Sequence, residues 1–490
     1  MGTLMDCRLP QLCATVTADW TAGLRASRDQ VAGADLVELR LDGVADPDVP
    51  AALAGRRLPA IVTCRPAGQG GRFRGSEDER KALLMQAFDA GAEYVDLEWG
   101  HGFDQVVRHR QGRGIVLSHH DFTGVPGDLE SIAVAMAASD AEVIKLAVAV
   151  ASLADCARLL GVARRLRGRR AVLIGMGEAG VMTRVLPGRF GSCWTYAGAS
   201  VAPGQLSVGQ MLQEFTFRRL GTDTVLYGIL GRPLGHSLSP AMHNAAFASL
   251  GVDAAYVPLP AAGVDDFFAS ADALGIAGAS VTAPFKVAAV AHMTTMDPVA
   301  AEIGALNTVV RGAGGWHGAN TDAAGFLASL AGLPLAGWRA AVLGTGGAAR
   351  AAALSLRDAG CAVTCYGRDE AKAQALASAL RVAGAVRPVP AGSWDLLVNT
   401  TPAGTHPNAG ESSFPEAVYD GRLVYDMVYN PAATRLLREA GARGCRTLGG
   451  LGMLVEQARL QSAMWTRMMP DRAVMHGAAE SKLASFTDAT

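Results

Sequence analysis

The sequence predicts an α/β protein that begins with a (β/α)8 barrel and continues into two further α/β lobes. Three observations lead to this prediction. Eight short runs rich in β-branched residues, separated by helix-length spacers, fill the first half of the chain. The composition breaks at 218–223, and a new strand pattern begins at Val225. Further on, a glycine-rich loop stands between a strand pattern and a helix pattern. The chain has 490 residues, enough for more than one core.

The first half is predicted to form a closed barrel of parallel strands. Strands that alternate with helix-length spacers pair through crossovers, and eight such units fit a closed barrel better than an open sheet. The predicted strands are residues 11–17, 36–41, 60–64, 94–98, 114–119, 143–149, 171–175 and 192–196. Active sites of such barrels lie at the carboxyl ends of the strands, so we expect chemistry there.

Polar residues stand at these strand ends. They are Glu38, Arg40, Arg65, Asp96, Glu98, His120, Lys145, Arg184 and Gln205. Each has an ordinary explanation when taken singly, because an arginine at a strand end usually pairs with a carboxylate and a lone histidine is more often structural. Their convergence on one end of a barrel predicts a polar site.

Lys145 gives the clearest indication of chemistry. It lies in the apolar run Val143-Ile144-Lys145-Leu146-Ala147-Val148, and burial in apolar surroundings disfavours the charged form of an amine. A neutral amine attacks ketones to form a Schiff base, which acidifies the neighbouring carbon. His120, one strand away, is the predicted general base because imidazole titrates near neutral pH. A lysine reaching solvent from a sheet edge fits poorly, since a closed barrel has no edge.

Six motifs of the first half resemble one known family over nearly all of residues 10–218. They are Val37-Glu38-Leu39-Arg40, Thr63-Cys64-Arg65, Asp96-Leu97-Glu98, Ser118-His119-His120-Asp121-Phe122, Lys145-Leu146-Ala147 and Ala202-Pro203-Gly204-Gln205. The family is type I 3-dehydroquinate dehydratase. The resemblance implies dehydration of 3-dehydroquinate to 3-dehydroshikimate through an imine between Lys145 and the C3 ketone, with His120 moving the proton at C2.

The same resemblance implies the substrate contacts of the barrel. Arg184 would bind the substrate carboxylate. The ring hydroxyls and the position of the acid would be held by Glu38, Arg65 and Gln205, with Arg40 in support.

Two positions depart from the family pattern. Gln69 stands where a glutamate usually orients the catalytic histidine, and Val201 stands where a hydroxyl residue is usual, unless Ser200 substitutes. Gln69 can accept a hydrogen bond from the imidazole but lacks the charge that favours imidazolium. We expect both changes to lower the dehydratase rate rather than abolish it.

The second half contains a predicted dinucleotide site. Ala340-Ala341-Val342-Leu343 runs directly into Gly344-x-Gly346-x-x-Ala349, and a helix pattern follows at 351–359. Glycines permit a tight turn and close backbone approach, and the helix N-terminus meets the pyrophosphate. This context predicts a Rossmann-type lobe. Arg368, at the end of the next strand pattern, suits a 2′-phosphate and favours NADP, whereas Asp369 keeps NAD open and a solvated surface arginine remains the alternative.

The sequence of residues 224–330 predicts a lobe that binds the substrate. The segment 231–240 ends a strand pattern and opens a helix with Ser237 and Ser239, which makes a natural carboxylate seat. Lys286 and Asp322 offer an opposite-charge pair of the kind that moves protons during hydride transfer. Either residue could instead cap a helix, as an Asp after Asn-Thr ordinarily does.

The motifs of the second half resemble shikimate dehydrogenase over residues 225–480. Besides the segments above they are Ala305-Leu306-Asn307-Thr308, Asn399-Thr400-Thr401-Pro402, Asp426-Met427-Val428-Tyr429-Asn430-Pro431 and 449–457. The resemblance implies that Ser237 and Ser239 bind the carboxylate and that Lys286 and Asp322 act on the reacting carbonyl. Ser280 and Gly367, where relatives often carry asparagine, weaken the fit only slightly.

Further contacts follow from this resemblance. Substrate hydroxyls would be bound by Thr282, Asn307 and Gln457, and Tyr429 would join the substrate site. The implied NADP contacts are Gly344, Gly346, Gly347, Ala348, Arg350, Arg368, Asn399, Thr401, Met427 and Gly450.

The two resemblances support each other, because the product of the first reaction is the substrate of the second. We therefore expect a bifunctional enzyme of the shikimate pathway with domains at 1–220, 224–330 joined by a returning C-terminal helix 452–480, and 331–451. A quinate dehydrogenase activity is the alternative among enzymes. A weak or degenerate barrel that only scaffolds or senses substrate is the alternative of another class, and it rests on Gln69 and Val201.

The composition favours small-molecule chemistry. Lys+Arg 44 against Asp+Glu 45 gives a net charge of -1, so no global field attracts nucleic acid or an anionic membrane. Charged residues interrupt the most apolar stretches, and the first ten residues have no apolar signal core, so we expect a cytoplasmic protein without a membrane span. The eight cysteines include no Cys-x-x-Cys pair, and we expect reduced thiols and no metal site.

Overall fold

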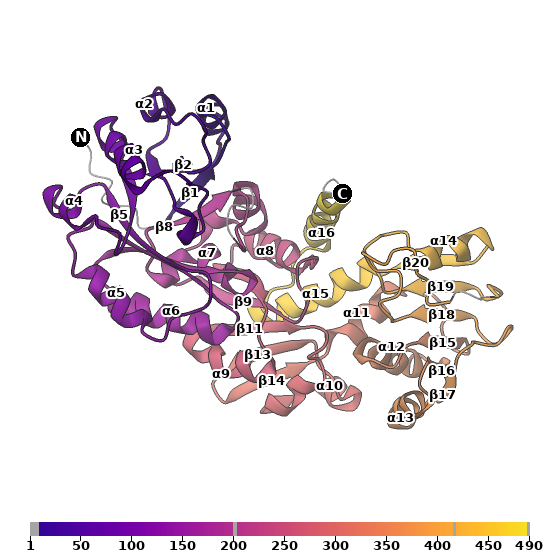
Figure 1. The fold of residues 1–490 in the computed structure, drawn as a ribbon. Helices are drawn as coiled ribbons and strands as arrows, with labels where there is room; N and C mark the ends of the chain where they lie inside the picture. Colours follow the sequence, from indigo (N-terminus) through magenta and orange to yellow (C-terminus); the bar gives the residue numbers. More distant parts are fainter. Residues whose placement is uncertain (1–8, 199–202, 415–417, 488–490) are drawn as a thin grey trace. The chain divides into compact units, whose positions relative to one another are not determined.

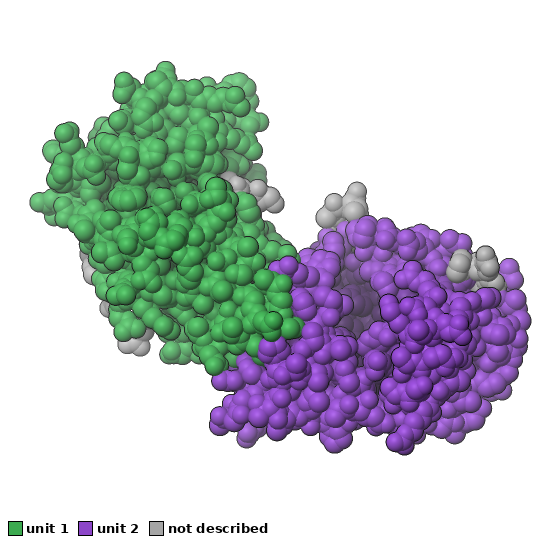
Figure 2. Space-filling view, turned by 60° about the horizontal axis from the view of Figure 1, so that its bottom comes forward, with its two compact units in different colours: residues 1–226, 253–276 green, residues 227–252, 277–490 purple. Residues whose placement is uncertain are grey.

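The computed structural model describes residues 9–198, 203–414 and 418–487. The chain forms two compact units, residues 1–226 with 253–276 and residues 227–252 with 277–490 (Figure 2). The predicted loss of a hydroxyl contact concerns Ser200 and Val201. Both residues lie outside the described residues. No helix in the described part of the chain is both long enough and apolar enough to cross a membrane.

The first unit contains the predicted eight-stranded parallel barrel. Its strands are β1 (Gln11–Val16), β2 (Leu36–Arg40), β3 (Ala60–Thr63), β4 (Tyr94–Glu98), β5 (Ile115–Asp121), β6 (Val143–Ala149), β7 (Arg170–Met176) and β8 (Trp194–Gly198). Their order is β7-β6-β5-β4-β3-β2-β1-β8. An isolated bridge between Ala171 and Ser192 joins the two end strands, so the barrel is nearly closed. The fold predicted for the first half is confirmed.

Helices surround the strands of this barrel (Figure 1). They are α1 (Thr21–Asp29), α2 (Val49–Leu53), α3 (Glu77–Asp89), α4 (Asp104–His109), α5 (Leu129–Ala137), α6 (Leu153–Arg165) and α7 (Val181–Val185). The sequence starts α3 and α6 with capping boxes, in which Ser76 pairs with Glu79 and Ser152 with Asp155. The first unit also includes β10 (Ala254–Leu259) and α9 (Val264–Leu274).

The interior of the barrel is layered. One apolar cluster includes Cys13, Ile61, Val116, Val143 and Trp194. Side chains alternate across a strand, so Val143, Lys145 and Ala147 of β6 share one face. Lys145 pairs in register with Ser118 of β5 and Val172 of β7. The lysine therefore lies one layer above the apolar floor.

A mixed sheet lies mainly in the second unit. The order of its strands there is β9-β11-β13-β14-β12. These strands are β9 (Val225–Leu230), β11 (Ile276–Val281), β13 (Thr308–Gly312), β14 (Gly315–Ala319) and β12 (Thr295–Met296). Its helices are α8 (Ser239–Leu250), α10 (Pro298–Ile303), α11 (Thr321–Ser329), α15 (Leu451–Thr466) and α16 (Arg472–Thr487). The returning segment predicted as one helix at 452–480 forms two helices, because α15 ends before Arg467, which adopts the left-handed conformation. Helix α15 packs against α11, and α16 packs against α8.

A six-stranded parallel sheet forms the dinucleotide lobe, with strand order β17-β16-β15-β18-β19-β20. Its strands are β15 (Arg339–Leu343), β16 (Ala362–Gly367), β17 (Ala383–Val386), β18 (Leu396–Asn399), β19 (Leu423–Asp426) and β20 (Arg446–Gly449). The helices are α12 (Gly347–Asp358), α13 (Glu370–Leu380) and α14 (Arg435–Ala442). The strand order reverses at β15, and ligands of such sheets bind at the carboxyl ends of the strands beside that reversal.

Candidate active sites

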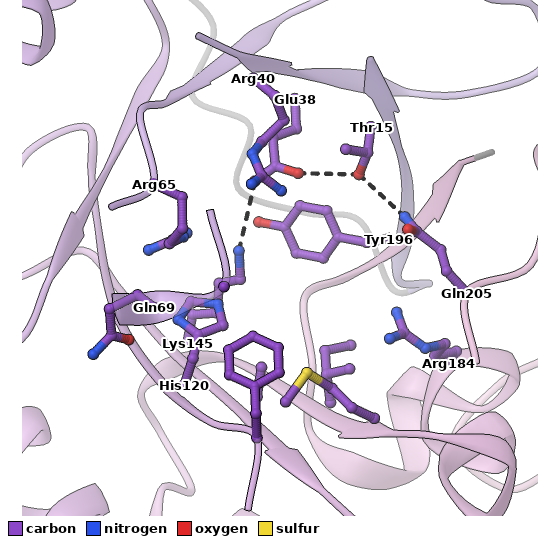
Figure 3. Close-up of a pocket in the computed structure, with 15 residues that line it drawn as sticks. Thr15, Glu38, Arg40, Arg65, Gln69, His120, Lys145, Arg184, Tyr196 and Gln205 are labelled. Carbon is purple, nitrogen blue, oxygen red and sulfur yellow. Dashed lines mark hydrogen bonds and ion pairs between the residues drawn. The ribbon is translucent and has the colours of Figure 1, made fainter. Parts of the chain in front are cut away.

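The polar residues predicted for the barrel line one cavity of about 80 Å³ (Figure 3). Those named from the sequence are Glu38, Arg40, Arg65, Gln69, His120, Lys145, Arg184 and Gln205. Figure 3 shows Lys145, His120 and Gln69 on one side of the cavity and Arg184 and Gln205 on the other. Thr15 and Tyr196 also line it. Sequence reasoning missed both, although each stands near the carboxyl end of a predicted strand.

Lys145 is buried, at 5% exposure, but its surroundings are not apolar as the sequence of its own strand suggested. Its Nζ lies 3.0 Å from Asp96 Oδ2 and 3.6 Å from Glu38 Oε1. The same nitrogen stands 4.3 Å from the centre of the Tyr196 ring. The apolar setting expected for Lys145 is therefore wrong, because other strands contribute carboxylates to its interior face.

His120 is held as a neutral imidazole. Burial, followed by the cationic Arg65 and Lys145, lowers the pKa of His120 well below the ordinary 6.5. Its Nδ1 is buried and makes no hydrogen bond to any described residue. The buried Oε1 of Gln69 likewise makes none to the described chain. The histidine can therefore accept a proton, and the glutamine adds no charge beside it.

Arg184 is a buried cation without a carboxylate partner among the described residues. It is 2% exposed, its Nε makes no hydrogen bond to the described chain, and NH2 donates to the carbonyl of Pro203 at 3.3 Å. Burial lowers the pKa of Arg184 to about 10. A buried, poorly paired guanidinium in a cavity is a ready seat for a substrate carboxylate.

A chain of hydrogen bonds fixes the upper side of the cavity. Gln205 Nε2 donates to Thr15 Oγ1 at 3.2 Å, and Thr15 Oγ1 donates to Glu38 Oε2 at 3.0 Å (Figure 3). Thr63 Oγ1 donates to the other Glu38 oxygen at 2.9 Å. Arg40 makes a two-point contact with Asp42, at 2.7 and 2.9 Å. The arrangement holds the Glu38 carboxylate and the Gln205 amide in place at the wall of the cavity.

The second unit contains a larger cavity of about 370 Å³. It brings together the residues predicted to bind the substrate or act on it, namely Ser237, Ser239, Thr282, Lys286, Asn307, Asp322, Tyr429 and Gln457, and Ser280 also lines it. Ala348, Met427 and Gly450, predicted to contact the cofactor, line the same cavity. The residues predicted for substrate and for cofactor therefore line one cavity.

Lys286 and Asp322 form the predicted pair. Lys286 Nζ lies 2.5 Å from Asp322 Oδ2, and Asn307 Nδ2 donates to Asp322 Oδ1 at 2.8 Å. Asn307 also donates to Gln457 Oε1 at 3.2 Å. The helix α11 is capped by Asn320, whose side chain accepts from the amides of the first turn. The capping alternative for Asp322 is thus wrong, and its carboxylate is available to Lys286.

The two serines predicted to bind a carboxylate lie at the start of α8. Ser237 Oγ accepts from the Ser239 amide at 3.2 Å, and both serines face the cavity. His236 stands beside them, with its ring 5.3 Å from that of His406 and 5.4 Å from that of Phe486. Sequence reasoning did not single out these two histidines.

Gly344 and Gly450 leave no room for a side chain beside the neighbouring loops. Gly344 has φ +128°, and a Cβ there would lie 2.4 Å from Thr400 Oγ1. A Cβ on Gly450 would lie 2.1 Å from the Met427 carbonyl oxygen. Asn399 accepts from the Thr401 hydroxyl at 2.7 Å and so fixes the facing loop. These residues fit a dinucleotide at the N-terminus of α12.

Arg368 is exposed at the end of β16, with Arg387 beside it. The Arg387 amide donates to the Gly367 carbonyl at 3.2 Å, and the buried Nε makes no hydrogen bond within the described chain. Burial and then the charge of Arg368 lower the pKa of Arg387. Two adjacent guanidiniums suit a phosphate monoester. Sequence reasoning missed Arg387, which belongs to the next strand connection.

The remaining predicted cofactor residues lie around this loop. Gly346 precedes α12, and Gly347, at its first position, would bring a Cβ to 3.3 Å from Lys286 Cδ. Arg350 donates to the Ile303 carbonyl at 3.1 Å. Among the described residues there is no cluster of side chains suited to a metal ion, and the seven described cysteines are free.

The fold and the two cavities define an enzyme with a lysine-bearing barrel joined to a dinucleotide-dependent oxidoreductase. Family models agree with this class. Residues 12–221 match type I 3-dehydroquinase, residues 229–309 match the shikimate dehydrogenase substrate binding domain, and residues 450–480 match the shikimate 5'-dehydrogenase C-terminal domain.

Individual relatives identify the family within this class of enzymes. A bifunctional 3-dehydroquinate dehydratase/shikimate dehydrogenase of Arabidopsis thaliana, chloroplastic by its name, is 32% identical over 93% of this chain and 82% of its own. A shikimate dehydrogenase (NADP(+)) of Moorella thermoacetica is 43% identical over 52% of this chain and 92% of its own. A crystal structure of a shikimate dehydrogenase in complex with NADP+ is 32% identical, covers 54% of this chain and 97% of its own, and gives a TM-score of 0.50. The chain belongs to the bifunctional 3-dehydroquinate dehydratase/shikimate dehydrogenase family.

Proposed function

We propose that the barrel dehydrates 3-dehydroquinate to 3-dehydroshikimate and that the second half reduces this product to shikimate with NADPH. Membership of the bifunctional family supports both activities. The observation that carries the barrel assignment is the buried Lys145 amine in a cavity with the neutral His120 and the poorly paired Arg184.

In the barrel, Lys145 Nζ would attack the C3 ketone and release water to form an imine. The imine withdraws electrons, so a neutral His120 can remove the C2 proton. The same imidazolium then protonates the departing C1 hydroxyl, and hydrolysis of the imine frees the product. Arg184 would hold the substrate carboxylate, while Glu38 and Gln205 would hold ring hydroxyls, with Arg40 in support. Arg65 would act mainly through the carboxylates that it holds.

In the second cavity, Ser237 and Ser239 would seat the carboxylate and Lys286 would donate a proton to the carbonyl oxygen. Asp322, fixed by Asn307, would hold the lysine in place. Thr282, Asn307, Tyr429 and Gln457 would complete the substrate site. When bound, NADPH supplies the hydride to the carbonyl carbon. The glycine loop would hold its pyrophosphate and Arg368 its 2′-phosphate.

Gln69 supports a second candidate function. In it the second half is an active dehydrogenase, and the barrel dehydrates 3-dehydroquinate only weakly or only binds it. The glutamine carries no charge, and its Oε1 makes no hydrogen bond to the described residues. Separate steady-state assays of the purified chain decide between the candidates. We expect dehydration of 3-dehydroquinate and NADPH oxidation with 3-dehydroshikimate, both at enzymatic rates. A chain that reduces 3-dehydroshikimate but leaves 3-dehydroquinate unchanged refutes the first proposal, and faster turnover of quinate than shikimate refutes the substrate assignment.

The domain limits 1–220, 224–330 with 452–480, and 331–451 remain part of this proposal. So does a cytoplasmic location without nucleic acid or membrane partners, which is supported by the free cysteines of the described chain and by the net charge of -1.

A further inference from the structure

Lys145 Nζ is surrounded by groups that favour positive charge. Asp96 Oδ2 is the nearest, at 3.0 Å, and Glu38 Oε1 follows at 3.6 Å. The face of the Tyr196 ring, whose quadrupole also attracts cations, lies 4.3 Å away. A cation that forms at this nitrogen is therefore stabilised by negative charge that is already in place.

Asp96 is the part of this surrounding that is fixed and permanently anionic. It is fully buried, and it accepts from Ser118 Oγ at 2.5 Å and pairs with Arg65 NH2 at 2.9 Å. Burial alone would raise the pKa of Asp96, but Arg65 and then Lys145 hold it well below its usual range. The carboxylate therefore stays ionised and does not serve as a base at neutral pH.

The charge at Nζ changes as the imine forms. The free amine attacks the ketone, so the N–C bond forms, and the resulting carbinolamine takes up one proton from solvent and loses one water to give an iminium. His120, as a neutral imidazole, can carry a proton from nitrogen to the departing oxygen. A fixed anion beside Nζ stabilises the positive charge that develops on nitrogen without changing its own state.

We propose that Asp96 is a catalytic residue of the barrel, the counter-ion of the iminium on Lys145. The proposal rests on the dehydration proposed above and adds a residue to it. Glu38 is a weaker candidate, because it lies farther from Nζ and its two oxygens accept from Thr15 and Thr63.

The chain offers a matched control for the loss of a buried carboxylate. Glu98 is buried in the same network and pairs with Arg65 NH1 at 2.7 Å and Arg80 NH1 at 2.5 Å, and Lys145 is not among its ion-pair partners in the described chain. Glu98→Gln therefore removes an equally buried charge while leaving Asp96 and Lys145 paired. An effect of Asp96→Asn that exceeds that of Glu98→Gln belongs to the contact with Nζ.

The test is borohydride trapping of the full-length chain with 3-dehydroquinate, read as the fraction of the Lys145 peptide that carries the adduct mass. We expect Asp96→Asn to trap about tenfold less than Glu98→Gln in equal time, and Asp96→Glu, which keeps the charge, to recover part of the loss. The kcat of dehydration should fall while KM changes less than threefold, because Arg184 and Gln205 are untouched. Asp96→Ala is the second neutral variant if the asparagine destabilises the barrel.

Two outcomes overturn the proposal and differ from each other. Equal trapping in Asp96→Asn and Glu98→Gln, with an adduct in the unmodified chain, removes Asp96 from the mechanism and leaves the imine on Lys145. Failure to trap any adduct in the unmodified chain during turnover refutes the imine itself, and with it the counter-ion. The dehydrogenase activity of each variant, measured with 3-dehydroshikimate, reports that the second half is intact.

Discussion

Lys145 Nζ lies 3.0 Å from Asp96 Oδ2, although β6 and β4 are separated by β5 in the barrel. The contact crosses the interior of the barrel rather than running along one strand or between neighbours. It places a fixed anion beside the amine that the barrel chemistry needs.

Lys145 is expected to carry the covalent intermediate. Borohydride added during turnover of 3-dehydroquinate should add the substrate mass to the peptide containing residues 143–148 and abolish dehydration while sparing the dehydrogenase. Lys145→Ala should remove both the adduct and the activity. Normal turnover without a mass shift on this peptide would mean that the reaction proceeds without an imine.

Gln69→Glu should raise the dehydratase rate. Gln69 Oε1 and His120 Nδ1 are both buried without hydrogen bonds in the described chain, and a carboxylate would orient the ring and favour imidazolium. Steady-state kcat is the measurement, with Gln69→Ala as the control that removes the amide without adding charge. An unchanged or lower kcat for Gln69→Glu would show that Asp96 or another group already governs His120.

The pH profile of dehydration should report the neutral histidine. Burial and then the cations Arg65 and Lys145 lower the pKa of His120 below 6.5, so the imidazole stays unprotonated as the pH falls to 6.5. The acid limb of kcat/KM should therefore lie below pH 6.5, with activity lost only at lower pH. Gln69→Glu should move the limb upward. A limb above pH 6.5 in the unmodified chain contradicts the assignment.

Arg184→Ala should weaken substrate binding. A hydrogen bond to a charged group contributes about 1.5 to 3 kcal/mol, which corresponds to roughly ten- to hundredfold in affinity. We expect that rise in KM for 3-dehydroquinate, and Arg184→Lys should recover part of it because it keeps the charge but loses the planar fork. A loss confined to kcat, with KM unchanged, would place the substrate carboxylate elsewhere.

Arg368→Ala should weaken NADPH by about 1.5 to 3 kcal/mol and leave NADH nearly unaffected, since only NADPH carries the 2′-phosphate. Direct binding of both cofactors is the measurement. Arg443→Ala, another exposed arginine of the same lobe, serves as the control. Equal losses for NADPH and NADH would mean that Arg368 positions the loop, and an unmodified chain that prefers NADH would shift the assignment to Asp369.

The fold was largely predictable because its signals are local. Each barrel strand is a short apolar run of its own, and β4 and β6 have the predicted bounds. The glycine loop is likewise set by its strand and helix. The bridge between Ala171 and Ser192, which nearly closes the barrel, lies within two predicted strands, but the local pattern of a strand does not show which strand it will pair with.

The candidate sites were predictable where a residue type stands at a strand end. The surroundings of Lys145 were not, because Asp96 is 49 residues away and meets it only when the barrel closes. Sequence reasoning missed Arg387, His236 and His406 for the same reason, because each contacts a residue from a distant segment of the chain. The structure shows that Asn320, not Asp322, caps α11. The sequence could not decide this, because two neighbouring polar residues can each cap the helix and their order gives no ranking.

The central claim is that one chain holds two independent active sites acting in sequence. The most direct test supplies purified chain with 3-dehydroquinate and NADPH and follows NADPH oxidation together with shikimate. We expect both in the unmodified chain and neither in Lys145→Ala or Asp322→Ala alone, while a mixture of the two variants restores them through released 3-dehydroshikimate. Failure of the unmodified chain to make shikimate from 3-dehydroquinate, while it still reduces added 3-dehydroshikimate, would contradict the account.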